Sequence, residues 1–301
     1  MTPPIDIQSP ETELIPRPKW LPIETYPFEI RALGAEEQRI AYTDVGRGPT
    51  LLFVHTGMWS FVWRDVIDLL RSDFRCVSLD APATGLSGGT PRTHATLRQA
   101  AARITVLVDA LGLDDLTLVF HDLGGPAALL AAAGWPPGRV RRLVAVNAFG
   151  WQPAGPLFRG MLGLMGSAPM REIDALTGFL PRITSTAFGV GRHLDRAARR
   201  AFRAGVDHRG RRSFHRYLRD ARRPDIYPDI EAATVALRTR PLLTIFGERN
   251  DPLHFQPQWK ERFPDTTGVV VPRGNHFPMC DAPPLVADAI RKFAATGRAG
   301  R

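Results

Sequence analysis

Cysteine is scarce in this sequence of 301 residues, which contains only Cys76 and Cys280. Two cysteines so far apart form neither the disulfide framework of a small secreted protein nor the spacing of a metal site. Cys76 lies within an apolar run and is expected to be a small buried residue. This cysteine usage predicts a reducing, cytoplasmic setting and no metal centre.

Long apolar runs are also missing. No run approaches the roughly 18–20 residues that a membrane-spanning helix requires. The N-terminal stretch lacks a basic segment followed by an apolar core, so we expect no signal peptide. It is rich in proline and is typical of an extended lead-in, which we place at residues 1–27. We therefore expect no membrane partner.

Charge is unevenly distributed along the chain. The formal net charge is +9, and the basic excess is concentrated between residues 192 and 223. No zinc-finger spacing or other nucleic-acid-binding motif accompanies it, so we expect no nucleic-acid partner. The stretch is typical of a solvated helical face. The alternative interpretation is that it attracts an acidic substrate or partner.

Apolar runs recur along the chain with helical patterns between them. With 44% hydrophobic residues the chain is long enough for one large domain with an insertion. We expect strands at 28–33, 38–45, 50–55, 74–79, 116–121, 142–147, 241–246 and 267–271. Most are continuously apolar, as strands buried on both faces are, and they alternate with helices. The sequence predicts an α/β fold with a mostly parallel eight-stranded sheet and helices on both faces.

The regular alternation stops between residues 150 and 239. This span is helical, rich in arginine and free of buried-strand patterns. We interpret it as a helical cap inserted into a core formed by residues 28–149 and 240–301.

The most informative stretch runs from Leu116 to Ala133. An apolar, β-branched run ends at His121, Asp122 follows, and Gly124 and Gly125 precede an Ala/Leu-rich helix. Small residues just after the apex are required where a strand turns sharply into a helix that packs against it. The pattern places Asp122 at the apex of a strand–turn–helix elbow. The alternative is that Asp122 only caps the helix.

Functional groups of an open α/β sheet gather beyond the carboxyl ends of its strands. Asp122, Asp251 and His276 each follow a predicted strand, in the order nucleophile, acid and base that α/β-hydrolases show. Glu248 competes with Asp251 for the role of the acid. Without this context, a lone loop histidine such as His276 is more typical of a surface residue.

Several segments carry a family resemblance. They are TYPFEIR, FVHTGMWSFVWRDVI, VSLDAPATGLS, VFHDLGGPAAL, FGERNDP and GNHFPMCDAP. With them the chain resembles the haloalkane dehalogenase and epoxide hydrolase branch of the α/β-hydrolase superfamily, over nearly its whole length outside the cap. The resemblance implies an α/β-hydrolase fold, with Asp122 as nucleophile, His276 as base and Asp251 as the acid that orients it.

The chemistry of such a set is coherent. A carboxylate can displace a leaving group from an sp³ carbon and form an alkyl-enzyme ester. A histidine then activates the water that hydrolyses the ester, and backbone N–H groups of Thr56 and Leu123 would form the oxyanion hole. We expect a small-molecule substrate and no organic cofactor.

The leaving-group site departs from the family pattern. Haloalkane dehalogenases hold the halide with a tryptophan directly after the nucleophile and a second Trp or Asn, which often lies in an HGNP loop. Here Leu123 follows Asp122, and the loop reads HTGM. The first hypothesis is therefore a dehalogenase-like hydrolase of unknown substrate.

Two alternatives stay open. An epoxide hydrolase would use Tyr217 or Tyr227, the only cap tyrosines, as proton donors, although both could simply be packing residues. A non-catalytic binding protein would show an occluded pocket or a displaced histidine. Trp59 is a tentative pocket residue or a core residue, and Asn147 is a tentative pocket or supporting residue. The oligomeric state is not predicted.

Overall fold

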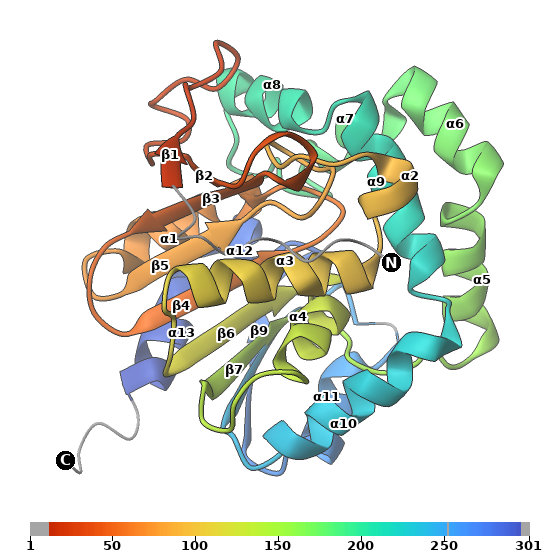
Figure 1. The fold of residues 1–301 in the computed structure, drawn as a ribbon. Helices are drawn as coiled ribbons and strands as arrows, with labels where there is room; N and C mark the ends of the chain where they lie inside the picture. The colour runs from red at the N-terminus through yellow and green to blue at the C-terminus, as the bar shows by residue number, and fades with distance from the viewer. Residues whose placement is uncertain (1–11, 252, 296–301) are drawn as a thin grey trace.

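The computed structural model describes residues 12–251 and 253–295, which form one sheet with helices on both faces (Figure 1). The described residues contribute nine strands to it. These strands are β1 Thr12–Leu14, β2 Arg31–Leu33, β3 Ile40–Val45, β4 Thr50–His55, β5 Arg75–Leu79, β6 Leu116–His121, β7 Val140–Val146, β8 Leu242–Gly247 and β9 Thr266–Val271. Eight of them match the predicted strands. The ninth, β1, lies in the predicted lead-in and pairs antiparallel with β2, so the predicted number of strands was one too low.

The strand order is β1-β2-β3-β5-β4-β6-β7-β8-β9. Strands β1, β2, β3 and β5 pair antiparallel, and all pairings from β5 through β4 to β9 are parallel. The first strands form a hairpin because Gly34, with φ of 73°, allows the turn between β2 and β3. The carboxyl ends of β4, β6, β7 and β8 are therefore neighbours at one edge of the sheet.

Successive residues of the central strands pack on opposite faces of the sheet. Leu52 and Val54 of β4 join one hydrophobic cluster, while Leu51 and Phe53 join the other. This period of two explains why these strands are apolar throughout. The first cluster is covered by α3 Leu97–Ala110, α4 Gly124–Ala132, α10 Tyr227–Leu237 and α11 Phe255–Arg262; the second by α1 Arg64–Leu70, α8 Arg196–Gly205, α12 Pro278–Asp281 and α13 Pro283–Ala295.

The segment between β7 and β8 contains helices joined by turns and loops, and no strand. It contains α5 Pro156–Met165, α6 Ala168–Thr177, α7 Phe179–Thr184, α8, α9 His208–Asp220, the short 3-10 helix Pro224–Ile226 and α10. Helices α5, α6 and α9 pack on one another at the right of Figure 1. The last helix, α10, packs instead against α4 beside the sheet.

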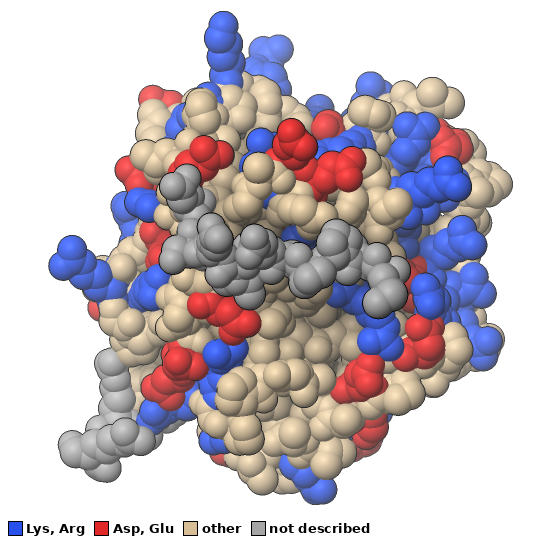
Figure 2. All heavy atoms as spheres, in the orientation of Figure 1, with Lys and Arg blue, Asp and Glu red and all other residues tan. Residues whose placement is uncertain are grey.

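Arginines of this segment have two roles. Several on α8 are exposed, including Arg196 and Arg200, and basic side chains gather over the inserted helices at the right of Figure 2. Arg209 of α9 instead donates to Ser87 O at 2.8 Å and to Gly85 O at 3.0 Å. The predicted solvated face is thus only part of their role, because some of these cations hold the insertion to the core.

Two further sequence expectations can be compared with the described residues. None of their helices is long and apolar enough to cross a bilayer, and none of their His, Cys, Asp and Glu side chains form a group of three or more arranged for a metal ion. Cys76 and Cys280 are buried free thiols.

Candidate active site

The elbow at the end of β6 has the geometry that its sequence predicts. Asp122 adopts φ of 51°, a left-handed conformation that aspartate tolerates better than most residues. A side chain at Gly124 would place Cβ 2.7 Å from Val54 O, and one at Gly125 would place it 2.2 Å from Phe149 O. Both positions therefore require glycine, and the close packing of α4 on β4 leaves Asp122 at the apex.

His276 faces Asp122. His276 Nε2 lies 3.8 Å from Asp122 Oδ2, and the two side chains are 35% and 22% exposed, so both are partly accessible to solvent. Burial alone would raise the pKa of the Asp122 carboxyl. The facing His276 ring, His121 and the Leu123 N–H outweigh this effect and hold the pKa below its usual value. Asp122 is therefore an anion at neutral pH, as a nucleophile must be.

The loop that carries His276 is held by neutral donors. His121 Nε2 lies 2.7 Å from His276 O and donates to it. Asn147 Nδ2 donates to Asn275 O and to His276 O, both at 2.9 Å, while its Oδ1 accepts from Gly247 N at 3.0 Å. Asn147 is buried and lies directly after β7 with φ of 38°. It holds the backbone of the loop that carries His276, and these bonds identify it as a supporting residue and not a pocket residue.

The predicted partner of His276 is not the one that the structure shows. Asp251 Oδ1 accepts from Phe255 N at 2.6 Å and Oδ2 from Gln256 N at 3.0 Å, so this carboxylate caps α11. Glu248, the competing candidate, accepts from Arg273 N at 2.7 Å. The side chain on the ring is Asn250, whose Nδ2 lies 3.1 Å from His276 Nδ1. The position of this loop directly after a strand is enough to predict from sequence that it supplies the partner of His276. Only the conformation of the loop decides which of its side chains reaches the ring.

Two further imidazole rings lie close to that of His276, and these two stack on each other. The His55 ring centroid lies 5.0 Å from that of His121, which lies 4.7 Å from that of His276. His55 and His121 are buried, and both ring nitrogens of His55 lack a hydrogen-bond partner among the described residues. Burial lowers the pKa of His55 to about 3 and also depresses that of His121. Both rings are neutral at neutral pH, so His121 is a fixed donor.

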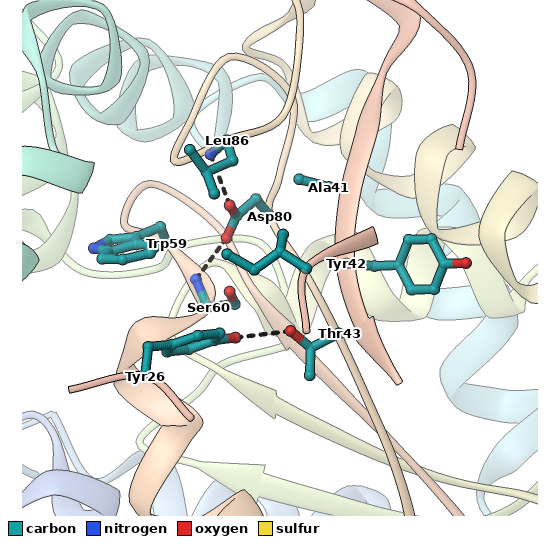
Figure 3. A pocket seen from close by; sticks show the side chains of 9 residues that line it. Tyr26, Ala41, Tyr42, Thr43, Trp59, Ser60, Asp80 and Leu86 are labelled. Atoms are coloured by element: carbon teal, nitrogen blue, oxygen red, sulfur yellow. Dashed lines mark hydrogen bonds between the residues drawn. The ribbon is translucent and has the colours of Figure 1, made fainter. Parts of the chain in front are cut away.

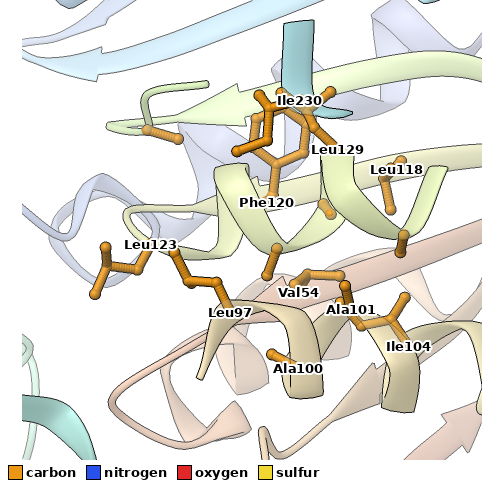
Figure 4. Close-up of a cluster of buried hydrophobic side chains, with 14 of the residues drawn as sticks. Val54, Leu97, Ala100, Ala101, Ile104, Leu118, Phe120, Leu123, Leu129 and Ile230 are labelled. Carbon is orange, nitrogen blue, oxygen red and sulfur yellow. The ribbon is translucent and has the colours of Figure 1, made fainter. Parts of the chain in front are cut away.

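The residues predicted for the oxyanion hole flank Asp122. The Leu123 side chain is fully buried in the hydrophobic cluster with Leu97 and Val54, as Figure 4 shows. Only its backbone N–H can therefore serve the site. Thr56 follows β4 and is buried, and its hydroxyl has no hydrogen-bond partner among the described residues.

An aromatic side chain of the insertion covers the loop after β4. Gly57 has φ of 88°, and a Cβ there would lie 2.8 Å from Cδ2 of Phe214 on α9. A larger residue at position 57 would therefore collide with Phe214. Sequence reasoning did not identify Phe214, because the direction of a side chain on an inserted helix follows only from how that helix packs.

Three residues that the sequence suggested for the pocket use their polar groups to bond backbone carbonyls instead. Tyr217 is buried and its hydroxyl donates to Pro82 O at 2.9 Å, while the Tyr227 hydroxyl donates to Ala221 O. Trp59 is buried and donates from Nε1 to Phe202 O at 3.2 Å. Trp59 lines a separate, water-sized cavity of about 10 Å³ with Tyr26 and Asp80 (Figure 3). All three are packing residues, since apolar burial and a single backbone acceptor satisfy each of them.

Comparisons with known proteins agree with this architecture. The Alpha/beta hydrolase family matches residues 51–289. Haloalkane dehalogenase 2 of Mycobacterium tuberculosis is 31% identical over 275 residues, which cover 89% of this chain and 95% of that protein. The cis-3-alkyl-4-alkyloxetan-2-one decarboxylase of Shewanella oneidensis is 26% identical over 285 residues, which cover 89% and 88%.

A solved structure shares the fold. The epoxide hydrolase CorEH without ligand superimposes with a TM-score of 0.75 at 23% identity, covering 89% of this chain and 99% of that one. The matched residues 51–289 contain the elbow, the inserted helices and, except for the first residue of β4, the parallel strands β4 to β9, whereas β1, β2 and β3 precede them. The chain belongs to the α/β-hydrolase family, as a hydrolase of the haloalkane dehalogenase and epoxide hydrolase branch.

Proposed function

We propose that this enzyme hydrolyses a small electrophilic alkyl substrate through a covalent ester on Asp122. The observation that carries the proposal is the placement of an ionised carboxylate at the elbow apex, 3.8 Å from His276 Nε2. A carboxylate at this position is suited to displacement at an sp³ carbon, because hydrolysis of the alkyl ester that forms returns the free carboxylate.

In the first step an Asp122 oxygen forms a bond to the sp³ carbon as the bond to the leaving group breaks. The leaving group departs with the electron pair. In the second step a water oxygen adds to Cγ of the ester while His276 Nε2 takes the water proton. Backbone N–H groups of Leu123 and Thr56 would stabilise the oxyanion. The intermediate collapses, the alcohol leaves with the proton from His276, and Asp122 ionises again.

The site offers the leaving group fewer side-chain hydrogen-bond donors than the family resemblance implies for a haloalkane dehalogenase. The residue after the nucleophile has a buried apolar side chain, and Gly57 has none. Trp59 Nε1 is already bonded to Phe202 O. A halide would therefore lack the two side-chain donors that the family resemblance implies. We propose a substrate whose leaving group needs less stabilisation.

A strained cyclic ester is the second candidate. The two cap tyrosines that could protonate an epoxide oxygen donate to Pro82 O and Ala221 O, so an alkoxide would depart unaided. A four-membered lactone opened at its alkyl C–O bond instead releases a carboxylate, which is a stable anion. The name of the Shewanella oneidensis relative specifies an oxetan-2-one substrate of this kind.

A non-catalytic protein is the least supported of the alternatives. That hypothesis expects an occluded pocket or a displaced histidine, whereas His276 faces Asp122 and both side chains are partly exposed. We further propose that α5 to α9 form the cap, with α10 belonging to the core against which it packs.

Mass spectrometry of a His276→Phe variant tests the proposal. Without the base the ester persists. Incubation with a haloalkane should leave the alkyl mass on the peptide that carries Asp122, whereas an epoxide or an alkyl-substituted four-membered lactone should leave the mass of the whole ring-opened molecule there. The double variant Asp122→Asn/His276→Phe is the control and should acquire no mass. No adduct from any class, with an intact fold, would reject Asp122 as the nucleophile for these substrates.

A further inference from the structure

A carboxamide lies against the ring of His276, on the side away from Asp122. Asn250 Nδ2 is the side-chain atom on His276 Nδ1, at 3.1 Å. Among the residues that the structure describes, the carboxylate within 4.0 Å of the ring is that of Asp122, on the opposite nitrogen. Asp251, one residue further along, has both oxygens occupied by backbone N–H groups of α11.

We propose that Asn250 is the positioning residue of His276, and that the orientation of its carboxamide sets which ring nitrogen carries the proton. The inference rests on the proposed function, since it concerns the base of the second step. It deepens that function by naming the group that controls breakdown of the ester.

The hydrogen-bonding capacity of the two groups carries the argument. A carboxamide nitrogen only donates, so with Nδ2 on the ring, Nδ1 accepts and a neutral ring carries its proton on Nε2. In that tautomer the Nε2–H group points toward Asp122, so Nε2 cannot take a proton from water. With the carboxamide turned over, Oδ1 accepts from Nδ1–H and Nε2 is free to act as the base. A carboxylate, which only accepts, would support the second form alone.

The charge of the partner also matters for the rate. A buried carboxylate beside Nδ1 stabilises the imidazolium that forms as water is deprotonated. Here the ionisable groups that face His276 are Asp122 at the elbow, His121 at the end of β6 and His55 at the end of β4. Asn147 and Asn250 are neutral. With both buried imidazoles uncharged, no anion among the described residues stabilises the cation from the Nδ1 side, so we expect ester hydrolysis to be the slow step.

A single-turnover experiment separates the two steps. The full-length enzyme is mixed with a substrate shown by His276→Phe to alkylate Asp122, and mass spectrometry follows formation and decay of the ester. Asn250→Asp is expected to speed the decay by about tenfold or more and to leave formation within about twofold. A carboxylate at position 250 favours the protonated form of the His276 ring. On acidification, the rate of ester hydrolysis should therefore begin to fall at a higher pH in Asn250→Asp than in the native enzyme.

Two further variants keep the test decisive. Asn250→Ala should slow the decay by about tenfold with formation unchanged, whereas a merely structural role would change both steps together. Asp251→Asn is the competing variant. Slower decay in Asp251→Asn, or unchanged decay in both Asn250 variants, overturns the inference. Absence of an adduct in His276→Phe instead overturns the proposed function, so the two failures are distinguishable.

Discussion

At the scale of single residues, Asp122 combines two requirements in one position. Its carboxylate is the proposed nucleophile, and its backbone occupies a left-handed conformation, with φ of 51°. Asparagine tolerates this conformation about as well as aspartate, whereas alanine is strained there. Chemistry and backbone strain can therefore be separated by choosing the substituent.

Asp122→Asn should reduce product formation by at least about a thousandfold, because a carboxamide is a poor nucleophile. The melting temperature should stay within about 3 °C of the native value, since the backbone conformation is retained. Steady-state kinetics and differential scanning fluorimetry measure both quantities. Asp122→Ala is the control and should lose activity and about 1 kcal/mol of stability. Retained activity in Asp122→Asn would contradict the assignment.

Tyr217→Phe distinguishes a packing residue from a proton donor. The hydroxyl is buried and donates to Pro82 O, so its removal should cost about 1 kcal/mol of unfolding free energy. Because the hydroxyl is engaged away from Asp122, kcat should stay within about twofold. Urea unfolding and steady-state kinetics test this pair. A large fall in kcat with unchanged stability would restore Tyr217 as a catalytic donor.

At the scale of elements, the site depends on how the ends of β6, β7 and β8 are joined. Asn147 connects the end of β7 to Gly247 of β8 and to the loop that carries His276. Glycines 124 and 125 let α4 approach the neighbouring backbone. Neither Asn147 nor the two glycines take part in the proposed reaction, yet they determine where Asp122 and His276 lie.

Asn147→Ala removes these connecting hydrogen bonds and leaves buried polar groups without partners. We expect a loss of about 2–4 kcal/mol of unfolding free energy and a slower decay of the ester. Chemical denaturation and the single-turnover assay give the two values. Asn147→Gly separates the strain at φ of 38° from the lost bonds, and should fall between native and Asn147→Ala in stability. Native-like stability in both variants would refute the connecting role.

Gly125→Ala tests the close packing of α4. The added Cβ would lie 2.2 Å from Phe149 O, so we expect a loss of about 3 kcal/mol or more. The matched control is Gly160→Ala in exposed α5, where a Cβ meets nothing within 4 Å. That change should stabilise the protein by about 0.5–1 kcal/mol through helix propensity. Equal effects of the two substitutions, measured by urea unfolding, would contradict the packing argument.

At the scale of the whole molecule, buried uncharged histidines link the stability of the fold to pH. Burial lowers the pKa of His55 to about 3. The unfolded chain binds a proton there near its ordinary pKa of about 6.5, and the folded chain does not. Between these values the unfolded state binds more protons, so stability rises with pH across this window. Acidification through it destabilises the fold.

His55→Phe should flatten this dependence. At pH 5 the contribution of His55 amounts to about 2 kcal/mol relative to pH 7.5, and the variant should lose that difference. His121, whose pKa is also depressed, keeps its own contribution in both proteins. Urea unfolding of both proteins at pH 5 and pH 7.5 measures the slopes. Parallel slopes would show that the His55 ring is protonated to the same extent in the folded and unfolded states.

The sequence by itself determined the alternation of strands and helices, and with it the sheet, the elbow and the placement of Asp122 and His276 near one another. It could do so because buried parallel strands are continuously apolar and because a tight elbow requires glycine at fixed offsets. The extra strand β1 was missed because three exposed residues, Thr12–Leu14, carry no burial pattern.

Only the tertiary structure decided the partners of those residues. Asn250 reaches the His276 ring while Asp251 caps α11, and both follow the same strand within one loop. Tyr217 and Trp59 satisfy backbone carbonyls, and Phe214 covers Gly57. Sequence periodicity records which face of an element is buried, but a side chain's partner depends on loop dihedral angles and on helix packing between distant segments. Those are fixed only when the whole chain folds.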